Sequence, residues 1–99
     1  MKPVDLMRSR YSAYALKLAD YIIATTDPES PHYEKDLTKW KKSILEFGNL
    51  DFTGLEILEE KDDTVTFKAH LRQENKDLSF IEKSLFRRKE GLWLYMRAQ

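Results

Sequence analysis

The hydrophobic positions near the start of the chain recur at helical spacing. Between residues 4 and 18 the apolar side chains stand three or four positions apart, as Val4, Met7, Tyr11, Tyr14 and Leu18. Residues with this spacing share one face of an amphipathic helix. The pattern therefore predicts a first helix over residues 4–18.

Two more helices are predicted before residue 49. One opens at Asp20 and ends before residues 27–31, because the two prolines there cannot continue a helical ladder. The other takes Asp36 as its N-cap and stops at Gly48 and Asn49. The apolar positions that give this last helix its buried face are Leu37, Trp40, Ile44 and Phe47.

After Gly48 the period of the pattern changes to two. From Val65 to Leu71 apolar residues alternate strictly with polar ones, which is typical of a half-buried antiparallel strand. Further strands are predicted around residues 55–57, 78–88 and 92–96, with turns at 61–63, 73–77 and 89–91. Helices followed by a strand meander predict an α+β domain, with the N-terminal helices packed on an antiparallel sheet.

The last two predicted strands are apolar on both faces. In the final strand Trp93 and Tyr95 share one face, and Leu92, Leu94 and Met96 share the other. The helices can cover only one of these faces, and large exposed apolar patches usually serve as interfaces. We therefore predict a homodimer formed through the sheet.

Composition narrows the class of protein. The 99 residues suit one domain, and 17 basic against 17 acidic side chains give no net charge, which disfavours nucleic-acid binding. The absence of cysteine excludes disulfides and thiolate metal sites. No apolar run reaches the roughly 18 residues of a membrane span, and no signal-peptide core opens the chain. We expect a cytoplasmic protein that does not enter a membrane.

Sequence motifs for common cofactors and catalytic centres are missing. The chain has no Gly-rich phosphate loop, no paired-histidine helix and no nucleophile elbow. We therefore expect no cofactor and no metal. His32 and His70 stand alone, and we interpret both as solvated or hydrogen-bonded side chains.

Glu82 is the most informative single position. It lies between Phe80 and Ser84 on an apolar strand face, where a carboxylate must be paired or neutralised. Arg10, about 60° from the centre of the first helix's apolar stripe, is the predicted partner. The pair could orient helix on sheet or face a ligand; in the third interpretation Glu82 is exposed.

Aromatic side chains supply the remaining candidates. Tyr11, Tyr14, Trp40, Trp93 and Tyr95 stand at core-like spacings, yet buried tyrosine and tryptophan need polar partners. Placed near one Arg and one Glu, they would line a small-molecule pocket. The candidate pocket residues are Arg10, Tyr11, Tyr14, Asp20, Trp40, Glu82, Ser84, Trp93 and Tyr95.

Two functions remain open at this stage. The first is a non-enzymatic binding or interaction module with a small internal pocket. The alternative is a small enzyme of isomerase or hydrolase type, in which Asp20 or Glu82 transfers a proton and Tyr11 or Tyr14 donates a hydrogen bond. Asp20 serves in the first case only as a helix cap.

Two motifs resemble a known family. Residues 6–14 (LMRSRYSAY) with 19–25, and the set Glu82, Ser84, Phe86 and Arg87 before a Gly91-to-Tyr95 segment, look like the middle domain of bacterial YchJ-like proteins. The resemblance implies a nuclear-transport-factor-2-like, or cystatin-like, fold, with a curved sheet cradling helices around a cavity. It also implies flanking SEC-C zinc-binding segments, which residues 1–99 lack, so we expect a single middle domain.

Overall fold

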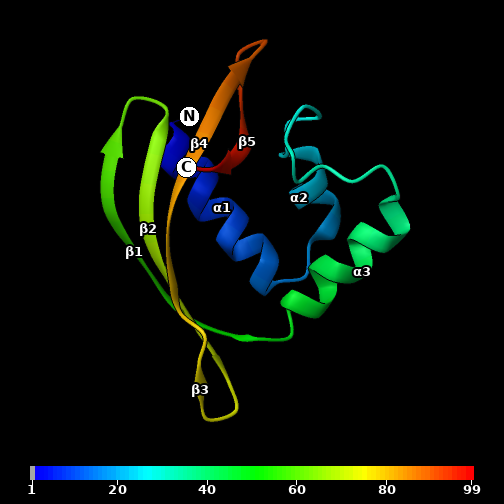
Figure 1. The fold of residues 1–99 in the computed structure, drawn as a ribbon, viewed down its shortest axis with the longest axis vertical. Helices are drawn as coiled ribbons and strands as arrows, with labels where there is room; N and C mark the ends of the chain where they lie inside the picture. The colour runs from blue at the N-terminus through cyan, green and yellow to red at the C-terminus, as the bar shows by residue number, and fades with distance from the viewer. Residues whose placement is uncertain (1) are drawn as a thin grey trace.

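The computed structural model describes residues 2–99 as three helices followed by five strands (Figure 1). The elements are α1 (Pro3–Ala15), α2 (Ala19–Ala24), α3 (Leu37–Phe47), β1 (Asp51–Lys61), β2 (Thr64–Gln73), β3 (Lys76–Asp77), β4 (Phe80–Lys89) and β5 (Leu92–Ala98). This order confirms the predicted α+β class, with helices first and an antiparallel sheet second.

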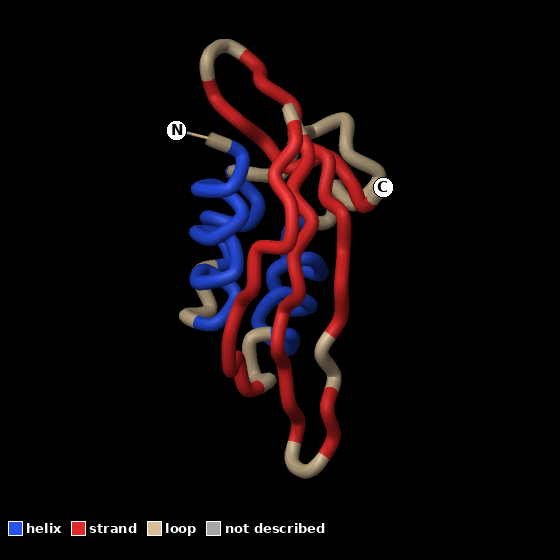
Figure 2. Tube along the Cα trace, turned by 90° about the vertical axis from the view of Figure 1, so that its left-hand side faces the viewer, coloured by secondary structure: helices blue, strands red, loops and turns tan. Residues whose placement is uncertain are grey.

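The sheet is antiparallel, in the order β1-β2-β4-β5. The predicted turn at residues 73–77 contains the short β3, which pairs with the end of β2 in a hairpin that projects beyond the helices (Figures 1 and 2). Register pairs Phe67 with Glu82 and Val65 with Ser84, so these four side chains lie on one face of the sheet. That face carries α1.

Helix α1 is shorter than the spacing predicted. It ends at Ala15, and Lys17 adopts a left-handed φ of 60° that breaks the helical ladder. Leu18 therefore lies outside the helix and is exposed instead of completing the apolar stripe. The helix is also buried over a wider arc than predicted, because Arg10 and Ala13 are buried together with Met7.

The two shorter helices differ in how well their starts were predicted. Leu18, not Asp20, is the N-cap of α2, so the predicted cap is wrong and Asp20 lies in the first turn, where a carboxylate favours the helix dipole. The cap of α3 is confirmed, since the Asp36 carboxylate accepts the Lys39 N–H at 3.1 Å. Trp40 is buried on the predicted face of α3.

Two apolar clusters hold the layers together. The first joins α1 to the sheet through Val4, Leu6, Met7, Val65, Phe67, Ala69 and Phe86. The second joins the three helices through Ala13, Ile22, Trp40 and Ile44. Helix α1 contributes to both clusters and therefore links the sheet to the other two helices.

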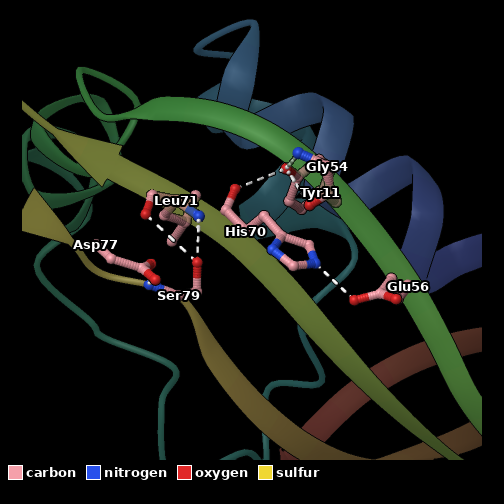
Figure 3. Close-up of polar contacts among 7 residues, drawn as sticks. All are labelled: Tyr11, Gly54, Glu56, His70, Leu71, Asp77 and Ser79. Carbon is pink, nitrogen blue, oxygen red and sulfur yellow. Dashed lines mark hydrogen bonds and ion pairs between the residues drawn. The ribbon is translucent and has the colours of Figure 1, made fainter.

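Tyr11 ties α1 to an irregular point of the sheet (Figure 3). Its hydroxyl donates to the Gly54 carbonyl at 2.7 Å, accepts the Gly54 N–H at 3.1 Å and lies 3.2 Å from the His70 carbonyl. The β1–β2 register shifts at this point, between Phe52 and Gly54, which frees these backbone groups from the ladder. The phenol hydroxyl replaces the missing strand partner.

The outer face of the sheet is mixed in character. Ile81 and Leu92 are 62% and 69% exposed, but Lys83 and Arg97 lie among the apolar residues of the same face. His70 pairs with Glu56 on this face, at 2.6 Å (Figure 3). Within residues 2–99, no helix is both long and apolar enough to cross a bilayer.

Candidate functional site

A cavity of about 410 Å³ lies between α1, α3 and the sheet. Its walls are mainly apolar and aromatic, with Met7, Ile44, Phe47, Phe52, Phe67, Leu71, Phe80 and Phe86 among them. Seven of the nine predicted pocket residues line it, namely Arg10, Tyr11, Tyr14, Trp40, Glu82, Ser84 and Tyr95.

Arg10 does not form the predicted ion pair with Glu82. Its Nη1 instead donates to the Ile22 carbonyl at 3.1 Å and to the hydroxyls of Thr25 and Thr26 at 2.7 and 3.1 Å. Burial lowers the pKa of Arg10 below its ordinary value. The guanidinium is held by the C-terminal end of α2, whose last carbonyls and hydroxyls face α1.

Tyr95 stands between the two groups that were expected to meet. The Arg10 Cζ lies 4.7 Å above the centroid of the Tyr95 ring, a cation–π arrangement. The hydroxyl of Tyr95 donates to Glu82 Oε2 at 3.3 Å. One aromatic side chain thus contacts the cation with its ring face and the carboxylate with its hydroxyl.

Ser84 completes the polar cluster of Arg10, Tyr95, Glu82 and Ser84. Its hydroxyl donates to the same Glu82 oxygen at 2.5 Å, and its side chain is buried. Burial, followed by the charge and hydrogen bond of Glu82, raises the pKa of Tyr95 above its ordinary value of 10.0. The Tyr95 phenol therefore stays protonated at neutral pH and remains a donor to the carboxylate.

Tyr14 adds a further hydroxyl to the cavity wall. Its pKa is raised above 10.0, mainly by burial, although the neighbouring charge of Arg10 acts in the opposite direction. The phenol is therefore neutral at physiological pH. Its ring packs edge-on against Phe47 at 5.2 Å, which fixes its direction from α1.

Asp20 and Trp93 do not line the cavity. Asp20 is solvent-exposed on α2 and forms an ion pair with Lys41 of α3 at 2.9 Å, so it cannot act as a base inside a pocket. Trp93 lies two pairs further along the β4–β5 hairpin than Tyr95, opposite Arg88, and packs against the cluster between α1 and the sheet. The cavity ends before that position.

Sequence reasoning missed the segment that closes one side of the site. Residues 25–30 run beside β5, where Asp27 donates its N–H to the Tyr95 carbonyl at 2.9 Å. Following them, His32 stacks on Tyr95 at 6.0 Å and lines the cavity together with Glu34. The cluster of acidic residues and prolines at 27–31 was the available signal, but it indicated only a helix stop.

A buried carboxylate anchors this segment. Asp27 is fully buried and bonded to Arg87 Nε at 2.9 Å and to the Glu29 N–H at 2.8 Å. Burial raises the pKa of Asp27, but these hydrogen bonds and the Arg87 charge outweigh it, so the pKa lies below its ordinary value of 3.8. In the described part of the chain, no three His, Asp or Glu side chains group closely enough to hold a metal ion.

Three helices pack on one face of an open antiparallel sheet and enclose a cavity with it. This arrangement is that of an NTF2-like domain. The chain belongs to the YchJ family, since residues 2–98 match the model described as YchJ, middle NTF2-like domain. This confirms the resemblance inferred from the two motifs.

Individual relatives agree with this assignment. A UPF0225 protein of Vibrio vulnificus is 35% identical over 95% of this chain and 57% of its own length, and one of Deinococcus radiodurans is 36% identical over 97% and 68%. The solution structure of a SEC-C motif-containing protein from Rhodopseudomonas palustris has a TM-score of 0.75 at 38% identity, covering 95% of this chain and 74% of that one. The chain thus spans little more than half of its Vibrio relative.

Proposed function

We propose that this domain is a non-enzymatic binding module that takes a small molecule into the cavity between α1, α3 and the sheet. Ligand pockets typically enclose about 300–1,000 Å³ and combine apolar walls with a few placed polar groups. The cavity has about 410 Å³ and this composition. The observation that carries the proposal is the Glu82 carboxylate, which Ser84 and Tyr95 fix at the cavity wall.

The polar cluster is preorganised for binding. Ser84 and Tyr95 both bond to Oε2 of Glu82, and Arg10 holds the Tyr95 ring from α1. A binding group that is already fixed loses little conformational entropy when a ligand arrives. The cluster can therefore orient a ligand whose apolar part contacts the aromatic walls.

The proton-transfer alternative now depends on Glu82 alone. Asp20, the second acid or base considered from the sequence, lies on the surface beside Lys41. Glu82 lines the same cavity as the neutral hydroxyl of Tyr14, which could donate to a carbonyl oxygen. Binding accounts for the cluster without a second catalytic group, and we prefer it for that reason.

A fragment screen followed by two-dimensional NMR tests the binding proposal. We expect aromatic fragments to shift the amide signals of cavity residues such as Tyr14, Phe67 and Glu82. Ala69→Leu places a larger side chain in the cavity and should abolish these shifts. Lys68→Leu, its neighbour on the opposite face of β2, is the matched control and should leave them unchanged.

The same screen can contradict the binding proposal. If no fragment shifts cavity signals, or if the shifts persist unchanged in a folded Ala69→Leu protein, then the cavity is not a binding site. The spectrum of each variant without ligand shows whether its fold is intact.

A homodimer through the sheet remains a prediction. Ile81 and Leu92 are exposed on the outer face, and a second copy could cover them. Sedimentation velocity over a wide concentration range tests this, and a monomer throughout would contradict it.

A further inference from the structure

Two carboxylates line the cavity without forming an ion pair in the described part of the chain. Glu82 receives only the neutral hydroxyls of Ser84 and Tyr95. Glu34 also lines the cavity, from the segment before α3. Among the ion pairs formed by residues 2–99, none within 4.0 Å includes either carboxylate.

The cation of the cavity, Arg10, already has one of its nitrogens bonded within the protein. Its Nη1 contacts three oxygens of residues 22–26, and its Cζ lies over the ring of Tyr95. The oxygens at the end of α2 and the face of the Tyr95 ring therefore stabilise its positive charge. His32, the other basic side chain among the lining residues, is solvent-exposed and stacked on the same tyrosine.

The aromatic walls favour the same kind of ligand as the carboxylates. The faces of aromatic rings attract cations, and this attraction increases where water is excluded. The rings that line the cavity are those of Tyr11, Tyr14, Trp40, Phe47, Phe52, Phe67, Phe80, Phe86 and Tyr95. A carboxylate in such surroundings is stabilised most by a charged donor at hydrogen-bond distance.

We infer that the ligand is an organic ammonium compound, an amine with an aromatic or aliphatic body, whose charged nitrogen binds Glu82. The apolar body lies against the phenylalanines of the sheet and α3, and Glu34 adds a second negative charge to the lining. An anionic ligand of the same size would meet two like charges and a single arginine whose Nη1 is already bonded. This inference rests on the proposed binding function and specifies its ligand class.

Three small probes of matched shape separate charge from shape: 2-phenylethylamine, 2-phenylethanol and phenylacetate. We expect the amine to bind about tenfold more tightly than the alcohol, as one charge-assisted hydrogen bond would give, and phenylacetate to bind most weakly. Affinities are measured by NMR titration of cavity signals. The comparison uses the unmodified protein and so does not depend on any variant folding.

The variant Glu82→Gln then assigns the effect to one residue. It keeps an oxygen that can accept from Ser84 while removing the charge, and we expect it to lower amine affinity about tenfold and to change alcohol affinity less than about twofold. Glu59→Gln, an exposed carboxylate of β1, is the control and should change neither.

The outcomes separate the two claims. Equal binding of amine and alcohol at the cavity, or preferred binding of phenylacetate, overturns the ammonium inference but leaves the pocket proposal standing. Amine binding that is insensitive to Glu82→Gln also overturns it. Failure of all three probes and of the fragment screen to shift cavity signals overturns both.

Discussion

Replacement of Glu82 by alanine measures how this carboxylate is held. The change removes the acceptor of the Ser84 hydroxyl, whose side chain is 2% exposed, and the acceptor of the Tyr95 hydroxyl. A buried hydroxyl left without a partner costs about 1–3 kcal/mol. The Tyr95 hydroxyl faces the cavity, where water can replace the carboxylate, so it adds little. We therefore expect Glu82→Ala to lower the free energy of unfolding by about 1–3 kcal/mol.

This magnitude distinguishes the observed arrangement from the ion pair predicted from sequence. If Glu82 neutralised Arg10 directly, its removal would leave a buried charge unpaired and would cost about 3–5 kcal/mol. Arg10 instead keeps its three oxygen partners near the end of α2 after the change. The expected loss in the free energy of unfolding is smaller because Arg10 keeps its hydrogen bonds when Glu82 is removed.

Urea denaturation followed by tryptophan fluorescence gives the free energy, and thermal unfolding should show about 4–8 °C per kcal/mol for a domain of this size. Glu82→Gln, which retains an acceptor, should cost less than about 1 kcal/mol. Glu59→Ala, at an exposed position of β1, should stay within about 0.5 kcal/mol. A loss for Glu82→Ala below about 0.5 or above about 4 kcal/mol would refute the reasoning.

Three further changes probe the scaffold. The pKa of Asp27 is lower in the folded protein than in the unfolded chain, so its contribution to the free energy of unfolding is complete above the unfolded value near 3.8 and is lost as the pH falls through the folded value. Denaturation measured at a series of acid pH values should show a steeper loss of stability for the parent protein than for Asp27→Asn. Parallel curves for the two proteins would contradict this. Tyr11→Phe removes the hydroxyl that satisfies Gly54, and denaturation should show a loss of about 1–2 kcal/mol; no change would mean that water replaces it. Asp36→Ala removes the α3 cap and should cost about 1 kcal/mol, which Asp36→Ser should largely restore.

Much of the site was predictable because its side chains follow strand alternation. Phe80, Glu82 and Ser84 share a face by period two, and Tyr11 and Tyr14 share a face of α1 by helical spacing. Asp20 and Trp93 were misplaced for a different reason. Spacing gives the face of an element, but it does not give where along that element a cavity ends.

The sequence by itself determined the order of elements, the α+β class, the cap at Asp36 and the family, since local periodicity and motif content are properties of the chain alone. Only the tertiary structure decided the partners of Arg10 and Glu82. Charge complementarity favoured a direct pair, but the end of α2 brings carbonyl and hydroxyl oxygens to Arg10, and β5 inserts Tyr95 between the two groups. Contacts between residues distant in sequence depend on how the layers pack. The native arrangement is the one in which all such contacts are favourable together, and a single pair of charges does not decide it.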